Sequence, residues 1–119
     1  MGYDIKLGIM AEIPRMDGDA FIPMAEPSEA HPTYNLRRLL TESMEWDFEQ
    51  GELYYVPEVL PSIDYGISRL EKHPEAYEQY SAANGWGSPQ DALVVLRSLY
   101  DCIVGLAAEW PVEAIWMKW

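Results

Sequence analysis

The densest group of ionisable side chains in this 119-residue chain is a run of carboxylates between residues 42 and 52. The run contains Glu42, Glu45, Asp47, Glu49 and Glu52. In a helix, Glu42, Glu45 and Glu49 would share one face, since residues three and four apart are neighbours. Such a face attracts basic partners, and the interleaved Trp46 and Phe48 add aromatic area that could hold one.

We therefore expect the partner-binding residues to be Glu42, Glu45, Trp46, Asp47 and Glu49. The same pattern also suits a solvated acidic face that serves only solubility, so the sequence leaves both interpretations open.

The second candidate is the segment 84–88, which reads Asn-Gly-Trp-Gly-Ser. Trp86 offers a π face to a base, a sugar or a side chain, and the neighbouring amides face the N-terminus of a predicted helix, which attracts anions. The possible ligand-binding residues are Asn84, Gly85, Trp86, Gly87, Ser88 and Tyr77. A tight turn in which Trp86 folds back onto the helix is the alternative, because no Lys or Arg lies close in sequence to hold a phosphate.

The sequence contains no recognisable motif for metal binding or for nucleophilic catalysis. His31 and His73 have no partner at a metal-ligand spacing, and no G-x-S-x-G motif marks a serine nucleophile. Cys102 lies between apolar residues of a predicted helix and suits the core. We expect no catalytic residues, no metal and no cofactor, and we predict that the protein is not an enzyme.

The excess of acidic over basic residues limits the kinds of partner that the protein could bind. The chain has 8 Lys and Arg against 20 Asp and Glu, a formal net charge of −12. Such a surface repels phosphate backbones and anionic membranes, so we expect neither direct nucleic-acid binding nor membrane binding. A single cysteine and an N-terminus without a secretory signal pattern predict a cytoplasmic protein, and the oligomeric state stays open.

Two strands are predicted at the ends of the chain. Residues 3–13 alternate between apolar and polar side chains, as a half-buried strand does. Residues 112–119 are rich in β-forming residues and could pair with that strand. The proline-rich segment 14–33 predicts an irregular loop, with a short strand over 20–24.

Helical spacing of apolar residues predicts three helices between these strands. They lie at 36–49, 61–72 and 89–110, and residues 74–80 could add one or two turns. Asn35 is the expected N-cap of the first helix, and Pro61 is a stronger start for the second than Pro57. Ser88 caps the third, with Asp91 completing a capping box.

The order of these elements predicts an α+β fold and a single domain over residues 1–119. The first and last strands would form a small antiparallel sheet, covered on one face by about three helices.

Several blocks together resemble one family of small uncharacterised proteins encoded by bacteriophages, prophages and actinobacteria. These blocks are Thr33-Tyr34-Asn35, Pro74 with Tyr77, the 84–88 segment, the leucine-rich helix around Cys102, and Pro111. The family pattern reads TYN, P-x-x-Y and NGWG, then such a helix, a proline and a β-like tail. The match covers about residues 33–119, and the acidic run 42–52 departs from the pattern. The resemblance implies a phage or mobile-element setting and no particular reaction.

These observations predict an acidic phage-type interaction protein with a counter-defence role in the host cytosol. It would inhibit a host nucleic-acid-binding or defence protein by occupying its basic surface. One alternative is a module that captures a nucleotide or sugar with the 84–88 loop and nearby tyrosines. A further alternative is a virion or assembly component, which self-association would reveal.

Overall fold

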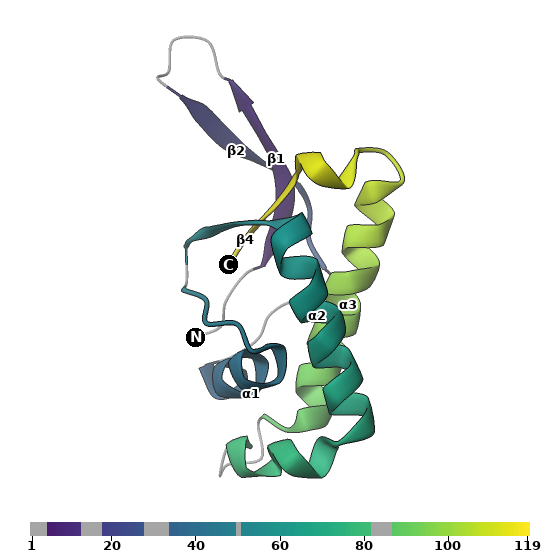
Figure 1. The fold of residues 1–119 in the computed structure, drawn as a ribbon. Helices are drawn as coiled ribbons and strands as arrows, with labels where there is room; N and C mark the ends of the chain where they lie inside the picture. Colours follow the sequence, from purple (N-terminus) through teal and green to yellow (C-terminus); the bar gives the residue numbers. More distant parts are fainter. Residues whose placement is uncertain (1–4, 13–17, 28–33, 50, 82–86) are drawn as a thin grey trace.

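The computed structural model describes residues 5–12, 18–27, 34–49, 51–81 and 87–119 (Figure 1). The strands are β1 (Lys6–Glu12), β2 (Asp19–Ala25), β3 (Leu53–Tyr55) and β4 (Ile115–Lys118). The α-helices are α1 (Tyr34–Met44), α2 (Val56–Lys72) and α3 (Pro89–Ala107). Two short 3-10 helices are η1 (Pro74–Tyr80) and η2 (Val112–Ala114). Among the described residues, no helix combines the length and the apolar content needed to cross a bilayer.

The strands form one antiparallel sheet in the order β2-β1-β4-β3. The predicted α+β fold is confirmed, and the first and last strands pair as expected, with Leu7 opposite Met117 and Ile9 opposite Ile115. Helices α2 and α3 run side by side, and α1 lies beside their lower half and contacts both (Figure 1). Strand β3 was not predicted, and β2 is one residue longer at each end than the predicted strand over 20–24.

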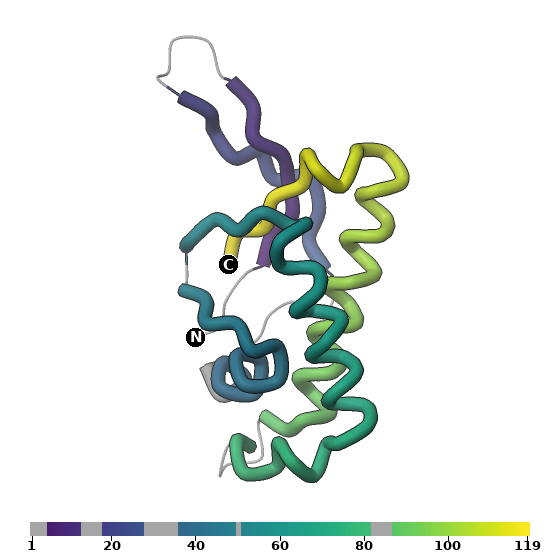
Figure 2. The backbone as a smooth tube through the Cα atoms, in the orientation of Figure 1, coloured from purple at the N-terminus to yellow at the C-terminus, as the bar shows by residue number. Residues whose placement is uncertain are grey.

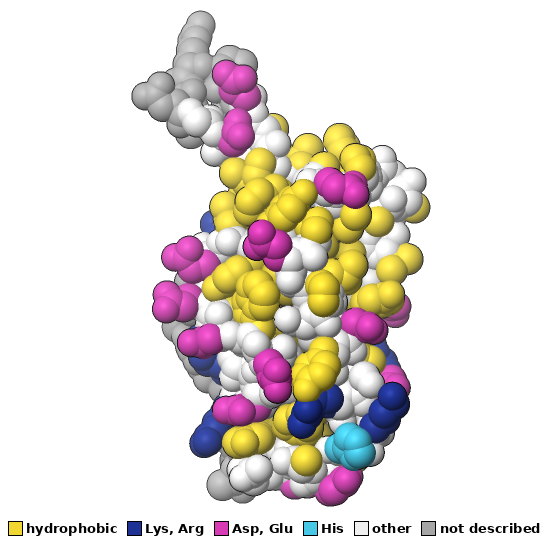
Figure 3. Space-filling view, viewed as in Figure 1, with side chains coloured by type: hydrophobic (Ala, Val, Ile, Leu, Met, Phe, Trp, Pro, Cys, Tyr) yellow, Lys and Arg dark blue, Asp and Glu magenta, His cyan; other side chains and the backbone are white. Residues whose placement is uncertain are grey.

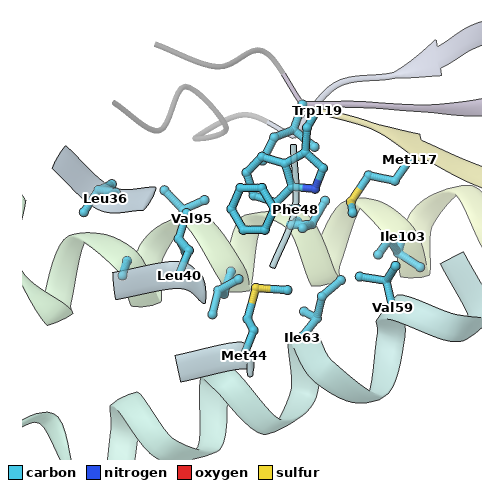
Figure 4. Packing of buried hydrophobic residues seen from close by; sticks show 14 of the residues in the cluster. Leu36, Leu40, Met44, Phe48, Val59, Ile63, Val95, Ile103, Met117 and Trp119 are labelled. Carbon is cyan, nitrogen blue, oxygen red and sulfur yellow. The ribbon is translucent and has the colours of Figure 1, made fainter. Parts of the chain in front are cut away.

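The core lies between the inner face of the sheet and the three α-helices (Figure 4). Strand β4 contributes Ile115 and Met117, which are fully buried, while Trp116 between them is only half-buried. The helices approach closely at Gly66 of α2, where an added Cβ would lie 2.9 Å from side-chain atoms of both Met44 and Leu96. A glycine at this point therefore lets α1, α2 and α3 pack against one another.

Helix α2 begins earlier than predicted, at Val56 rather than Pro61. Pro57 occupies the first turn, where its missing N–H costs nothing, and Pro61 lies inside the helix. The burial of Val56 and Val59 on the core side compensates for the one backbone hydrogen bond that Pro61 removes. The third helix ends at Ala107 instead of Trp110, before the turn that leads to Pro111.

Strands β1 and β2 form a hairpin that extends beyond the helices (Figure 2). Its register contains a bulge: Leu7 pairs with Ala25 and Gly8 with Pro23, so Met24 has no partner on β1. Pro23 lacks an N–H and lies on an edge strand, where a proline and a bulge are both tolerated. At Gly8 the two strands approach so closely that an added Cβ would lie 2.0 Å from the carbonyl oxygen of Ile22.

We predict that Gly8→Ala destabilises the protein by about 1–3 kcal/mol, because the added methyl must push the β1 and β2 backbones apart. The matched control is Gly105→Ala in α3, where nothing apart from the neighbouring residues and backbone of the same helix lies within 4 Å of the added Cβ. This control should stabilise by about 0.5–1 kcal/mol, since alanine favours helix. Urea unfolding of both variants measures the difference, and equal effects would contradict the proposed clash.

Candidate partner-binding surface

Helix α1 ends at Met44, so the predicted helix over 36–49 is wrong beyond that residue. Glu45 adopts a left-handed backbone with φ of 53°, and the N–H of Trp46 donates to the carbonyl of Thr41 at 3.2 Å. This is the Schellman arrangement that closes many helices. Glu42, Glu45 and Glu49 therefore do not share a helical face.

Residues 45–49 alternate instead with a period of two. Glu45, Asp47 and Glu49 are exposed, whereas Trp46 is half-buried and Phe48 is fully buried. We call residues 45–52, which also include the exposed Glu52, the acidic segment. The alternation Glu-Trp-Asp-Phe-Glu was visible in the sequence, but the four-residue spacing of Met44 and Phe48 imitates a helix.

Phe48 anchors the acidic segment to the core. Its ring stacks on that of Trp119, with centroids 3.7 Å apart and planes inclined by 15° (Figure 4). On the far side of the segment, the N–H of Gly51 donates to the carbonyl of Trp119 at 2.7 Å. The N–H of Trp119 in turn donates to the carbonyl of Glu52 at 3.4 Å. Phe48, Gly51 and Glu52 thus all attach the acidic segment to Trp119.

Tyr54 of β3 supports the middle of the segment. Its hydroxyl accepts a hydrogen bond from the N–H of Glu49 at 2.8 Å, and Trp46 packs edge-on against its ring with centroids 5.8 Å apart. The indole N–H of Trp46 is buried and has no acceptor among the described residues. Trp46 therefore belongs to the support of the acidic segment, rather than standing exposed as the expected partner anchor.

The carboxylates of the acidic segment have little internal compensation. Arg37 forms an ion pair with Asp47 at 3.4 Å, and the Asp47 side chain is still 89% exposed. Glu45 accepts a hydrogen bond from the hydroxyl of Tyr65 at 3.4 Å. In the part of the chain that the structure describes, no other ion pair reaches this segment. Because exposed ion pairs contribute little, most of its negative charge faces solvent.

Figure 3 shows how charge and apolar surface are arranged on one face. Asp and Glu side chains lie along the margin where the connection from α1 to β3 runs in Figure 1. Apolar side chains gather inside that margin, over β3, β4 and the start of α2. Most of the visible Lys and Arg side chains lie in the lower half of this view, some of them beside acidic side chains of the same margin. The acidic segment therefore borders an apolar surface.

The second predicted site is only partly visible, because Asn84, Gly85 and Trp86 lie outside the described residues. The predicted capping box is present: the Oγ of Ser88 accepts from the N–H of Asp91 at 3.2 Å, and the Asp91 carboxylate accepts from the N–H of Ser88 at 3.1 Å. Gly87 is buried. Tyr77 is also buried, and its hydroxyl accepts a hydrogen bond from Arg69 Nε. The polar groups of Ser88 and Tyr77 thus already have partners within the chain.

A groove of about 510 Å³ lies elsewhere, between Glu26 after β2 and the outward side of α3, where Cys102 lines it. Burial raises the pKa of the Cys102 thiol, which makes it a poorer nucleophile at neutral pH. No cluster of His, Cys, Asp or Glu in the described ranges could hold a metal ion.

Comparison of the chain with protein-family models, with curated proteins and with solved structures found no match. The resemblance to phage and actinobacterial proteins therefore stays a prediction.

We predict that Glu45→Gly stabilises the protein by about 1 kcal/mol, because glycine adopts a positive φ without the strain of a side chain. Glu42→Gly is the matched control, with the same change of charge inside helix α1. It should destabilise by about 1 kcal/mol. Opposite shifts of the unfolding midpoint are expected, and shifts of the same sign would show that charge removal, rather than backbone geometry, dominates.

Proposed function

We propose that this protein acts by binding the basic surface of another protein through the acidic segment. The target class that fits is a nucleic-acid-binding or defence protein of a host cell, encountered in the cytosol and inhibited because its basic groove is occupied. The observation that supports this most is the display of Glu45, Asp47 and Glu49 on one exposed side of a segment anchored by Phe48.

The spacing of the carboxylates suits competition with nucleic acid. Glu45, Asp47 and Glu49 are exposed at alternate positions, so three carboxylates lie within five residues of the chain. A nucleic-acid strand likewise carries closely spaced negative charges, one for about every 3.4 Å along the helix axis. A groove that binds phosphates with Lys and Arg could therefore accept the carboxylates of the acidic segment in their place.

The anchoring of the segment favours recognition over solubility. Acidic residues that serve only to prevent aggregation can lie anywhere on the surface, and their backbone does not need a fixed conformation. Here the stack of Phe48 on Trp119 and the hydrogen bonds of Glu49 and Gly51 hold the backbone in one conformation. A preorganised segment loses less conformational entropy on binding, which raises the affinity that a given set of contacts supplies.

The test compares two pairs of charge reversals with the same change of net charge. Glu49→Lys with Glu52→Lys alters the acidic segment, and Glu75→Lys with Glu78→Lys alters exposed acids of η1. Immobilised wild-type protein captures partners from a bacterial host lysate at low salt, and association rates are then measured for each captured protein. The first pair should slow association by about tenfold, since reversed charges remove electrostatic steering. The second pair should leave it nearly unchanged.

Two results would contradict the proposal. An equal loss in both pairs would show attraction by net charge alone, without a specific surface. A captured partner that duplex DNA or RNA fails to displace would exclude a nucleic-acid-binding groove as the target. Circular dichroism of both variants establishes that each is folded before association is compared.

A further inference from the structure

The sheet has a second face, which points away from the core. Alternation along β4 places Ile115 and Met117 on the core side, so Trp116 and Lys118 lie on the other side, which we call the outer face. Their partners on β1, Gly8 and Lys6, belong to the same face. Trp116 and Lys6 are half-buried and Lys118 is exposed, so this face is open to solvent.

Apolar side chains occupy the middle of the outer face. Trp116 pairs with Tyr55 across β4 and β3, with ring centroids 5.0 Å apart. On its other side Trp116 faces Gly8, where the ring of Phe21 from β2 lies within 3.0 Å of the position that a Cβ would take. An aromatic band therefore runs across the sheet from β3 to β2, and Met10, paired with Phe21, extends it along the hairpin.

The two ends of the outer face carry opposite charges. At one end Lys6 is directly opposite Lys118, and at the other end Glu12 is directly opposite Asp19. Like charges in such cross-strand positions destabilise a sheet. Within the described residues none of these four side chains forms an ion pair. Residues 6 and 12 of β1 lie at opposite ends of the strand, and a rise of about 3.3 Å per residue separates the two pairs by about 20 Å.

We propose that the outer face binds a second copy of this chain, with the two sheets packed face to face. A two-fold axis lying in the interface, perpendicular to the strands, turns the lysine end of one copy over the acidic end of the other. Lys6 and Lys118 then meet Glu12 and Asp19 of the second copy, twice in each dimer. The face is complementary to itself only in this orientation, as an isologous contact requires.

The aromatic bands meet in the middle of this contact. Packed sheets lie about 10 Å apart, a separation that side chains from both inner faces fill. Trp116, Tyr55 and Phe21 supply that area, and aromatic residues dominate the energetics of such interfaces. The net charge of −12 on each copy opposes association. At physiological ionic strength, however, charges beyond about 8 Å are largely screened, so the local pairs and the apolar contact determine the outcome.

The experiment measures the oligomeric state of the full chain by sedimentation velocity over a series of concentrations. We expect a reversible equilibrium between a 13.6 kDa monomer and a dimer of twice that mass. Lys118→Glu should weaken the dimer by roughly tenfold, because it places an acid opposite the acidic end of the second copy. The same variant should not lower the thermal stability of the monomer, since within one copy it replaces a repulsion with Lys6 by an attraction.

The quadruple variant with Lys6→Glu, Lys118→Glu, Glu12→Lys and Asp19→Lys exchanges the charges of both ends and should restore the dimer to within about threefold of wild type. Lys72→Glu at the end of α2 is the control, with the same charge change away from the outer face, and should leave dimerisation unchanged. A chain that stays monomeric at every concentration overturns the proposal. So does a dimer that Lys118→Glu leaves intact or that the quadruple variant fails to restore. The binding of a basic partner is measured in a separate experiment. Failure of the dimer proposal would therefore leave the proposed function untouched, and the reverse also holds.

Discussion

The stack of Phe48 on Trp119 is the contact on which the rest of the arrangement depends. The chain leaves helical geometry after Met44, and four residues later Phe48 reaches Trp119, the residue that follows β4. The stack also brings Glu52 to Trp119, whose backbone N–H donates to the Glu52 carbonyl, and β3 begins at the next residue. One aromatic pair thus positions the acidic segment and adds the last strand to the sheet.

A sheet covered on one side only must expose its other side to solvent or to a partner. In antiparallel sheets of this kind the solvated face usually carries polar residues, which alternate with apolar residues of the core face. Here the middle of the outer face carries Trp116, Tyr55 and Phe21, and only its ends are charged. This composition is typical of an interface, where apolar residues fill the centre and charged residues the rim.

The sequence predicted those parts of the structure in which a local signal and the tertiary contacts agree. Alternation over 3–13 gave β1, and the capping residues Ser88 and Asp91 gave the start of α3. The prediction failed where a distant contact decides. The end of α1 is set by a left-handed Glu45, a residue type that rarely adopts this conformation, and by a ring that lies beyond β4. Neither can be inferred from residues 36–49 alone.

The two proposed surfaces meet at Lys118, which precedes the residue that holds the acidic segment. In a dimer, Glu12 and Asp19 of the second copy would approach that end of the sheet, and the lysines would stand between them and Glu52. Two acidic segments in one particle would also bind a target with two basic patches more tightly than one segment does. The two proposed associations would differ in their response to salt, because the apolar band would hold the copies together while charge alone would attract the target. Rising ionic strength would therefore release the target before it separated the copies.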